Sequence, residues 1–186
     1  TSALENGFGF CDVVFGWDIV DELYDKATVT GWHTGYPDAP AVIDVNSYRK
    51  IPWEPDTALF IADFQYSDGS PYPACPRQLC KQILQKADDM GFTVKSAFEY
   101  EFFLFDETPH SVREKKYETL TPFTPGMFGY SVIRNSVHSE FYHDFIDTCQ
   151  NMDMELEGLH TETGPGVLEA CISVDSGLAS ADKAAL

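Results

Sequence analysis

Long apolar runs, basic residues and paired cysteines are all scarce in this chain of 186 residues. No apolar stretch is long enough to span a bilayer, and no basic segment followed by an apolar one opens the chain, as it would in a signal peptide. Twelve Lys and Arg stand against 30 Asp and Glu, which gives a formal net charge of −18. This balance argues against a nucleic-acid partner, whose phosphates need a basic face, and against binding to anionic membranes.

The cysteines form no CxxC pair, and their number is odd. They are scattered along the chain, at Cys11, Cys75, Cys80, Cys149 and Cys171. Such a distribution favours free thiols in a reducing compartment over a disulfide framework, and therefore a cytoplasmic location.

Several familiar catalytic and nucleotide-binding patterns are also missing. Neither GxxxxGK[ST] nor GxGxxG occurs, so any ATP must be bound without those loops. No serine lies in a nucleophile-elbow context. His138 and His143 are five residues apart on a predicted helix and do not share a face well, so we interpret them as surface histidines.

Hydrophobic residues make up 44% of the chain and aromatic residues 14%, which is enough for a packed core. The segment SPYPACP, residues 70–76, is the candidate domain boundary because it contains three prolines. Periodicity predicts an α+β fold in which helices cover an antiparallel-rich sheet. The expected elements after the boundary are a helix from Pro76 to about Gly91, a strand over 93–105, a helix over 137–151, and strands over 153–162 and 166–174.

Both ends of the sequence suggest a fragment. The chain starts at Thr1, and the final SADKAAL is typical of a helix that is just beginning.

The stretch SAFEYEFFLF, residues 96–105, places Glu99 and Glu101 on one face of a predicted strand. Aromatic residues dominate both faces, so the strand is expected to be buried. A buried carboxylate requires a basic partner, a shared proton or a metal ion. Because bases are scarce, a hard divalent cation such as Mg²⁺ or Mn²⁺ is favoured. The alternative is an edge strand whose glutamates lie in water.

A second acidic cluster lies in EGLHTETGPGVLEA, residues 157–170. His160 and Glu162 share a strand face, and the TGPG turn allows Glu169 to return toward them. Together with Glu101, the two glutamates make a plausible metal site of three carboxylates. The spacing by itself is weak support, and polar residues around an exposed hairpin are the alternative interpretation.

SAFEYEFFLFD followed by GLHTETGPGVLEA resembles the glutamine synthetase family, in its class I and γ-glutamyl-amine ligase branch. The upstream stretch 43–77 is similar to the family's link between an N-terminal β-grasp domain and the catalytic domain. The resemblance implies a partial β-grasp domain over 1–70 and the first part of a catalytic domain over 71–186. The family forms an amide from glutamate and ammonia or an amine, using ATP and two divalent cations, by way of γ-glutamyl phosphate.

The resemblance also implies roles for individual residues. The metal nearer glutamate and ammonia would be held by Glu101, Glu162 and Glu169, and the ATP-side metal in part by Glu99. Glu157 and Tyr130 would line the nucleotide site and the active-site wall. Asp18 would bind ammonium for a neighbouring subunit, since the family assembles into homo-oligomeric rings.

The family's other metal ligands and its arginines come later than Leu186, so these 186 residues alone are not expected to catalyse the reaction. Two alternatives stay open at this point. One is a non-catalytic structural or scaffolding relative of the same family. The other is an unrelated acidic α+β domain whose motifs match by coincidence.

Overall fold

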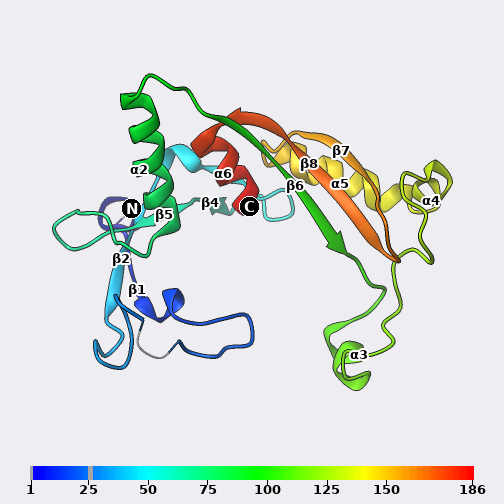
Figure 1. Ribbon diagram of the computed structural model, residues 1–186, viewed down its shortest axis with the longest axis horizontal. Coiled ribbons are helices and arrows are strands. Elements are labelled where there is room, and N and C mark those ends of the chain that lie inside the picture. Colours follow the sequence, from blue (N-terminus) through cyan, green and yellow to red (C-terminus); the bar gives the residue numbers. More distant parts are fainter. Residues whose placement is uncertain (1, 25–26) are drawn as a thin grey trace. The chain divides into compact units, whose positions relative to one another are not determined.

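The computed structural model describes residues 2–24 and 27–186 (Figure 1). The chain divides into two compact units, Thr1–Val94 and Lys95–Leu186. Both combine helices with antiparallel strands, as the sequence predicted. Among the described residues, none of the helices has both the length and the apolar composition needed to cross a membrane.

The N-terminal unit is built on a three-stranded antiparallel sheet in the order β1-β2-β5. Its elements are α1 (Ser2–Asn6), β1 (Phe8–Cys11), η1 (Asp12–Phe15), β2 (Asp38–Ile43), η2 (Val45–Ser47), β3 (Arg49–Lys50), β4 (Ala58–Leu59), β5 (Ala62–Phe64) and α2 (Pro76–Asp89). The buried core of this unit gathers around Ala39, Tyr72 and Cys75, with Phe15 and Phe64 packed against it.

Helix α2 has the bounds that its end signals predicted. Pro76 occupies the first turn, where no backbone N–H is needed. Gly91 follows the helix with φ of 82°, a left-handed conformation that favours glycine. Arg77 fastens α2 to the rest of the unit, because its guanidinium donates to Asp44 Oδ2 at 2.8 Å and to Asp63 Oδ1 at 2.9 Å.

The C-terminal unit contains a second antiparallel sheet, in the order β6-β8-β7. Its elements are β6 (Lys95–Phe103), α3 (Pro109–Glu114), α4 (Val132–Val137), α5 (Ser139–Asn151), β7 (Leu156–Thr161), β8 (Val167–Ser176) and α6 (Gly177–Ala185). The three predicted strands and the C-terminal helix are all present. The predicted helix over 137–151 is α5, which begins at Ser139, whereas the short α4 before it was not predicted; His138, with φ of −114°, separates the two.

The two faces of this sheet differ in character. One face carries the buried Leu168, Ala170 and Ile172 of β8. Helix α5 lies along the sheet on this side (Figure 1), where the rings of Phe102 and Phe145 stack with centroids 6.2 Å apart. Because side chains alternate along a strand, the residues between these apolar ones point to the opposite face. That opposite face carries the acidic residues.

The expectation that β6 is a buried strand is wrong. Seven of its nine residues are exposed, and these include Glu99 and Glu101. Within the described chain β6 pairs with β8 alone, so it forms an edge of the sheet. An edge strand leaves its side chains open to water, and the aromatic content of SAFEYEFFLF does not distinguish this position from a central one.

Candidate metal centre

Strand register brings the two acidic segments together on the sheet face that does not carry Leu168. Glu99 lies opposite Cys171, and Glu101 lies opposite Glu169. Glu169 in turn lies opposite His160 of β7. Residues directly opposite one another in an antiparallel sheet share a face and approach closely. The long hairpin between β7 and β8 therefore concentrates negative charge along one stripe of the sheet.

His160, Glu162 and Glu169 form one tight group. The Nδ1 atom of His160 lies 3.7 Å from Glu162 Oε1, and its Nε2 atom lies 3.6 Å from Glu169 Oε1. One ligand atom from each residue falls within 4.8 Å of the other two. The imidazole thus lies between two carboxylates that are seven positions apart in the sequence.

Glu162 combines burial with an unsatisfied oxygen. The residue is 8% exposed. Its Oε2 atom accepts from the Thr163 backbone N–H at 2.9 Å and from the Thr163 hydroxyl at 3.3 Å. Its Oε1 atom is buried and has no hydrogen-bond partner among the described residues. Such an atom is costly in a folded protein unless something else approaches it.

Neighbouring donors keep this carboxylate charged. The nearby Tyr130 hydroxyl lowers the pKa of the Glu162 carboxyl most, although its geometry to Glu162 falls outside that of a hydrogen bond; the Thr163 donors act in the same direction and burial opposes them. Glu162 is therefore ionised at neutral pH. In the described part of the chain, no ion pair joins Glu99, Glu162 or Glu169 to a lysine or arginine. A divalent cation fits the buried, charged Glu162 carboxylate, which has a second carboxylate close by and no lysine or arginine partner.

Tyr130 is held beside this group by a strained loop. Its φ of 59° lies in the left-handed region, which is uncommon for a residue with a side chain. Its backbone N–H donates to the Thr161 carbonyl at 2.7 Å, and the Ser131 N–H donates to the Thr161 hydroxyl at 3.2 Å. The Tyr130 ring then lies 4.8 Å from the His160 ring. Glu162 raises the pKa of the Tyr130 hydroxyl, so this hydroxyl stays protonated and able to donate.

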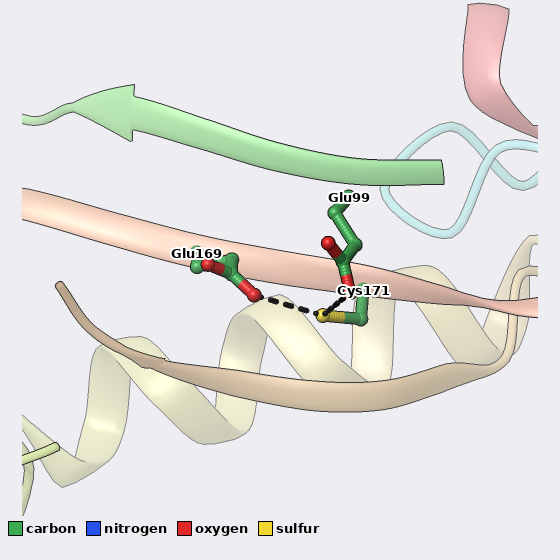
Figure 2. Close-up of side chains that lie close together, drawn as sticks. All are labelled: Glu99, Glu169 and Cys171. Carbon is green, nitrogen blue, oxygen red and sulfur yellow. Dashed lines mark hydrogen bonds between the residues drawn. The ribbon is translucent and has the colours of Figure 1, made fainter. Parts of the chain in front are cut away.

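Glu99, Glu169 and Cys171 form a second tight group, drawn in Figure 2. The Cys171 Sγ atom lies 3.2 Å from Glu169 Oε1 and 3.8 Å from Glu99 Oε1. Burial and the two carboxylates together raise the pKa of this thiol to about 11. Glu169 thus belongs to both groups and lies between them.

The remaining residues selected from the sequence belong to neither of these groups. Glu101 is opposite Glu169 and exposed, and it belongs to neither tight group of the described residues. Glu157 is exposed at a bulge of β7, where the register shifts between Leu156 and Gly158. Asp18 belongs to the N-terminal unit, where its Oδ1 atom orders a turn by accepting from the N–H groups of Val20 and Glu22.

Two residues of the site were given no ligand role from the sequence. They are His160, which was noted only as sharing a face with Glu162, and Cys171, which was interpreted as a scattered thiol. The signal for both was strand alternation, because His160 is two positions from Glu162 and Cys171 is two positions from Glu169.

Comparison with known proteins identifies the family. The model of the glutamine synthetase catalytic domain matches residues 73–186, which is more than half of the chain. The chain belongs to the glutamine synthetase family. The antiparallel sheet that carries the acidic stripe lies wholly within the matched region.

Curated members of the glutamine synthetase family resemble the chain along nearly its whole length. Type-1 glutamine synthetase 2 of Dictyostelium discoideum is 44% identical over 185 residues, which cover 100% of this chain and 35% of that protein. Glutamate–isopropylamine ligase of a Pseudomonas species is 30% identical over 179 residues, which cover 96% of this chain and 39% of the relative. The chain therefore spans a little over a third of the length of these relatives.

Solved structures show the same fold. A crystal structure described as a novel glutamine synthase homolog matches with a TM-score of 0.76 at 24% sequence identity, over 99% of this chain and 40% of the other. A GmaS/ADP complex matches with a TM-score of 0.74 at 20% identity, over 98% of this chain and 38% of the other. At these identities the likeness concerns the fold alone.

Proposed function

We propose that the protein containing this chain is an ATP-dependent ligase. It forms glutamine, or a γ-glutamylamide, from glutamate and ammonia or an amine by way of γ-glutamyl phosphate. The observation that carries the proposal is the buried, ionised Glu162 oxygen that has no hydrogen-bond partner among the described residues and lies beside Glu169 in a family-matched domain. The names of two relatives, a glutamine synthetase and a glutamate–isopropylamine ligase, support the reaction class.

The acidic stripe would hold the two divalent cations, Mg²⁺ or Mn²⁺, that this chemistry uses. Glu101, Glu162 and Glu169 would hold the cation on the glutamate side, and Glu99 would supply one ligand to the cation on the ATP side. Carboxylate oxygens are the ligands that such hard cations prefer. When bound, the cations neutralise the negative charge that gathers around a transferring phosphoryl group.

The chain's own side chains would position these ligands and the substrates. Thr163 fixes one oxygen of Glu162 through two hydrogen bonds, which leaves the other oxygen directed to the cation. Tyr130 and Glu157 would line the nucleotide side and the wall of the site. Asp18 would bind the ammonium ion, and it would do so for the neighbouring subunit of a homo-oligomeric ring.

The same proposal assigns the two domains and the cellular location. Residues 1–70 would be part of an N-terminal β-grasp domain, and 71–186 the first part of the catalytic domain. The start of the family match at residue 73 supports this boundary. Five free cysteines support a cytoplasmic location.

The acceptor is tested by steady-state kinetics on the full-length protein. Glutamate, ATP and Mg²⁺ would be supplied with ammonia or with a panel of alkylamines, and phosphate release would be measured. We expect release that depends on the acceptor, with ammonia slightly preferred. A large preference for one amine would overturn the ammonia assignment, and no release with any acceptor would support a non-catalytic relative instead.

The same assay on the Glu162→Gln variant tests whether Glu162 binds the cation. It keeps the size of the side chain and removes its charge, so we expect kcat/KM to fall by roughly 100-fold or more if the residue ligates the cation. Exposed Glu140, on helix α5, provides a comparison, and Glu140→Gln should leave kcat/KM unchanged.

A further inference from the structure

A cavity of about 160 Å³ lies in the N-terminal unit, where residues near strands β1, β2 and β5 surround it. Its lining combines carboxyl groups, tyrosine rings and small apolar side chains, and includes Asp12, Val29, Asp38, Pro40, Tyr66 and Tyr72. Asp38 and Tyr66 are exposed, so a ligand can reach the cavity from solvent. Asp18, the proposed ammonium ligand, is not among the described residues that line it.

Asp12 lines this cavity with a buried carboxyl oxygen that the described chain leaves unsatisfied. The residue is 2% exposed, and its Oδ1 atom is buried without a hydrogen-bond partner among the described residues. Such an oxygen is costly unless a donor reaches it, and a buried carboxylate also needs a counter-charge. In the part of the chain that the structure describes, the ion pairs of lysine and arginine involve neither Asp12 nor Asp38.

The Tyr72 hydroxyl serves only one of the two Asp12 oxygens. It carries a single proton, which it donates to Asp12 Oδ2 at 3.0 Å. Burial and the neighbouring Asp12 raise the pKa of this hydroxyl to about 12, so it stays protonated at neutral pH. The Tyr72 ring also stacks on Phe15, with centroids 5.1 Å apart. One oxygen of Asp12 is therefore held in place, and the other is left to a ligand.

Tyr66 and Tyr72 give the cavity two aromatic walls. Their ring centroids are 5.2 Å apart, and the ring planes are inclined by 50°. The face of an aromatic ring attracts an ammonium group that lies within about 6 Å of its centroid. Val29, Ala39 and Pro40 add apolar surface. The carboxyl and the rings suit a cation that donates hydrogen bonds, and the apolar surface suits a hydrocarbon body attached to it.

We propose that this cavity binds a small primary alkylammonium ion. Its ammonium group donates to Asp12 Oδ1 and lies against the tyrosine rings, while its hydrocarbon body contacts the apolar side chains. Because an engineered cavity of about 150 Å³ admits benzene, the ion is expected to contain about five to seven non-hydrogen atoms. Binding is non-covalent, and it does not rest on the proposed ligase function.

Calorimetric titration of the full-length protein with butylammonium chloride, at neutral pH and without glutamate or ATP, measures this binding. 1-Butanol has the same number of non-hydrogen atoms and no charge, so it is the matched ligand. We expect saturable binding of butylammonium that is roughly 10-fold or more tighter than that of butanol, because only the cation supplies a counter-charge to the buried carboxyl. Butylammonium binding that is absent, or no tighter than that of butanol, overturns the proposal.

Variants of the lining assign the binding to this cavity. Asp12→Asn keeps the size of the side chain and removes its charge, so it should weaken butylammonium binding by roughly 10-fold or more. Tyr66→Leu removes an exposed ring and should weaken it by about 2-fold to 5-fold. If circular dichroism shows that Asp12→Asn does not fold, Tyr66→Leu decides the outcome. Asp56→Asn, in an exposed turn of the same unit, should leave the affinity unchanged.

Asp18→Asn separates this cavity from the proposed ammonium site. We expect this variant to retain butylammonium binding, since Asp18 does not line the cavity. Binding that is lost in Asp18→Asn and kept in both Asp12→Asn and Tyr66→Leu would place the amine at the proposed acceptor position and overturn the assignment.

Discussion

Leu168 and its neighbour on strand β8 show that the position of a residue along a strand decides whether its side chain is buried or available to bind a ligand. Its side chain has 0% exposure, and it lies opposite Phe102 of β6 and Thr161 of β7. Its neighbour Glu169 points to the other face and belongs to both groups of potential metal ligands. One step along the strand thus separates the best-buried side chain of the sheet from its most connected carboxylate, because the side-chain period of a strand is two.

Replacing Leu168 with alanine is expected to destabilise the full-length protein by about 3 kcal/mol, from lost transfer free energy and the cavity that remains. Urea unfolding would measure the change. Val174, on the same strand and exposed, is the matched control, and Val174→Ala should change the free energy of unfolding by less than about 0.5 kcal/mol. Equal effects for the two variants would contradict the packing described here.

Helix α3 and the side chain of Glu107 hold the segment that follows strand β6 in place. A capping box starts this six-residue helix, with the Thr108 side chain accepting from the Ser111 N–H at 3.1 Å. Glu107 is 4% exposed at its side chain, forms an ion pair with Lys115 and accepts from the Thr121 N–H at 2.7 Å. Lys115 is the largest of the influences that lower the pKa of Glu107 to about 2.

This lowered pKa gives a pH dependence of stability with a definite sign. The folded-state pKa of about 2 lies below the unfolded value of 4.5, so the stabilisation is fully present above pH 4.5 and is lost as the pH falls toward 2. Glu107→Gln should lower the melting temperature at neutral pH and flatten its decline over that acid range. Thermal melts across the range would show this, with exposed Glu118→Gln as control. Parallel profiles for Glu107→Gln and wild type would refute the assignment.

For the molecule as a whole, the excess negative charge and the membership of the glutamine synthetase family both indicate that a divalent cation stabilises the fold. The chain carries −18, and part of that charge is concentrated on one face of the β6-β8-β7 sheet. Self-repulsion of this kind destabilises a compact state. A cation that binds the folded protein alone stabilises it by mass action.

Mn²⁺ is therefore expected to stabilise the full-length protein against unfolding, by about 2.7 kcal/mol at a concentration 100 times its dissociation constant. Melting temperature measured as a function of Mn²⁺ concentration tests this. Glu162→Gln should remove most of the increase, whereas Glu140→Gln should preserve it. An increase of the same size in Glu162→Gln would argue that Mn²⁺ stabilises the protein at some other position.

Local patterns in the chain were sufficient for much of the fold. Pro76 and Gly91 marked the ends of α2 because their backbone preferences are intrinsic. Alternation within SAFEYEFFLF and within the segments on either side of TGPG predicted the three strands of the acidic sheet. The short helix α3 was not predicted, because a six-residue helix has too little periodicity to detect.

Tertiary structure decided the rest. It placed β6 at an edge, so Glu99 and Glu101 are exposed rather than buried, a distinction that depends on which strands pair. It set the register that brings Cys171 opposite Glu99 and His160 opposite Glu169. Residue type and spacing indicate which side chains share a face of one strand. Only pairing between strands determines which faces meet, and in the case of β6 that pairing joins residues about seventy positions apart.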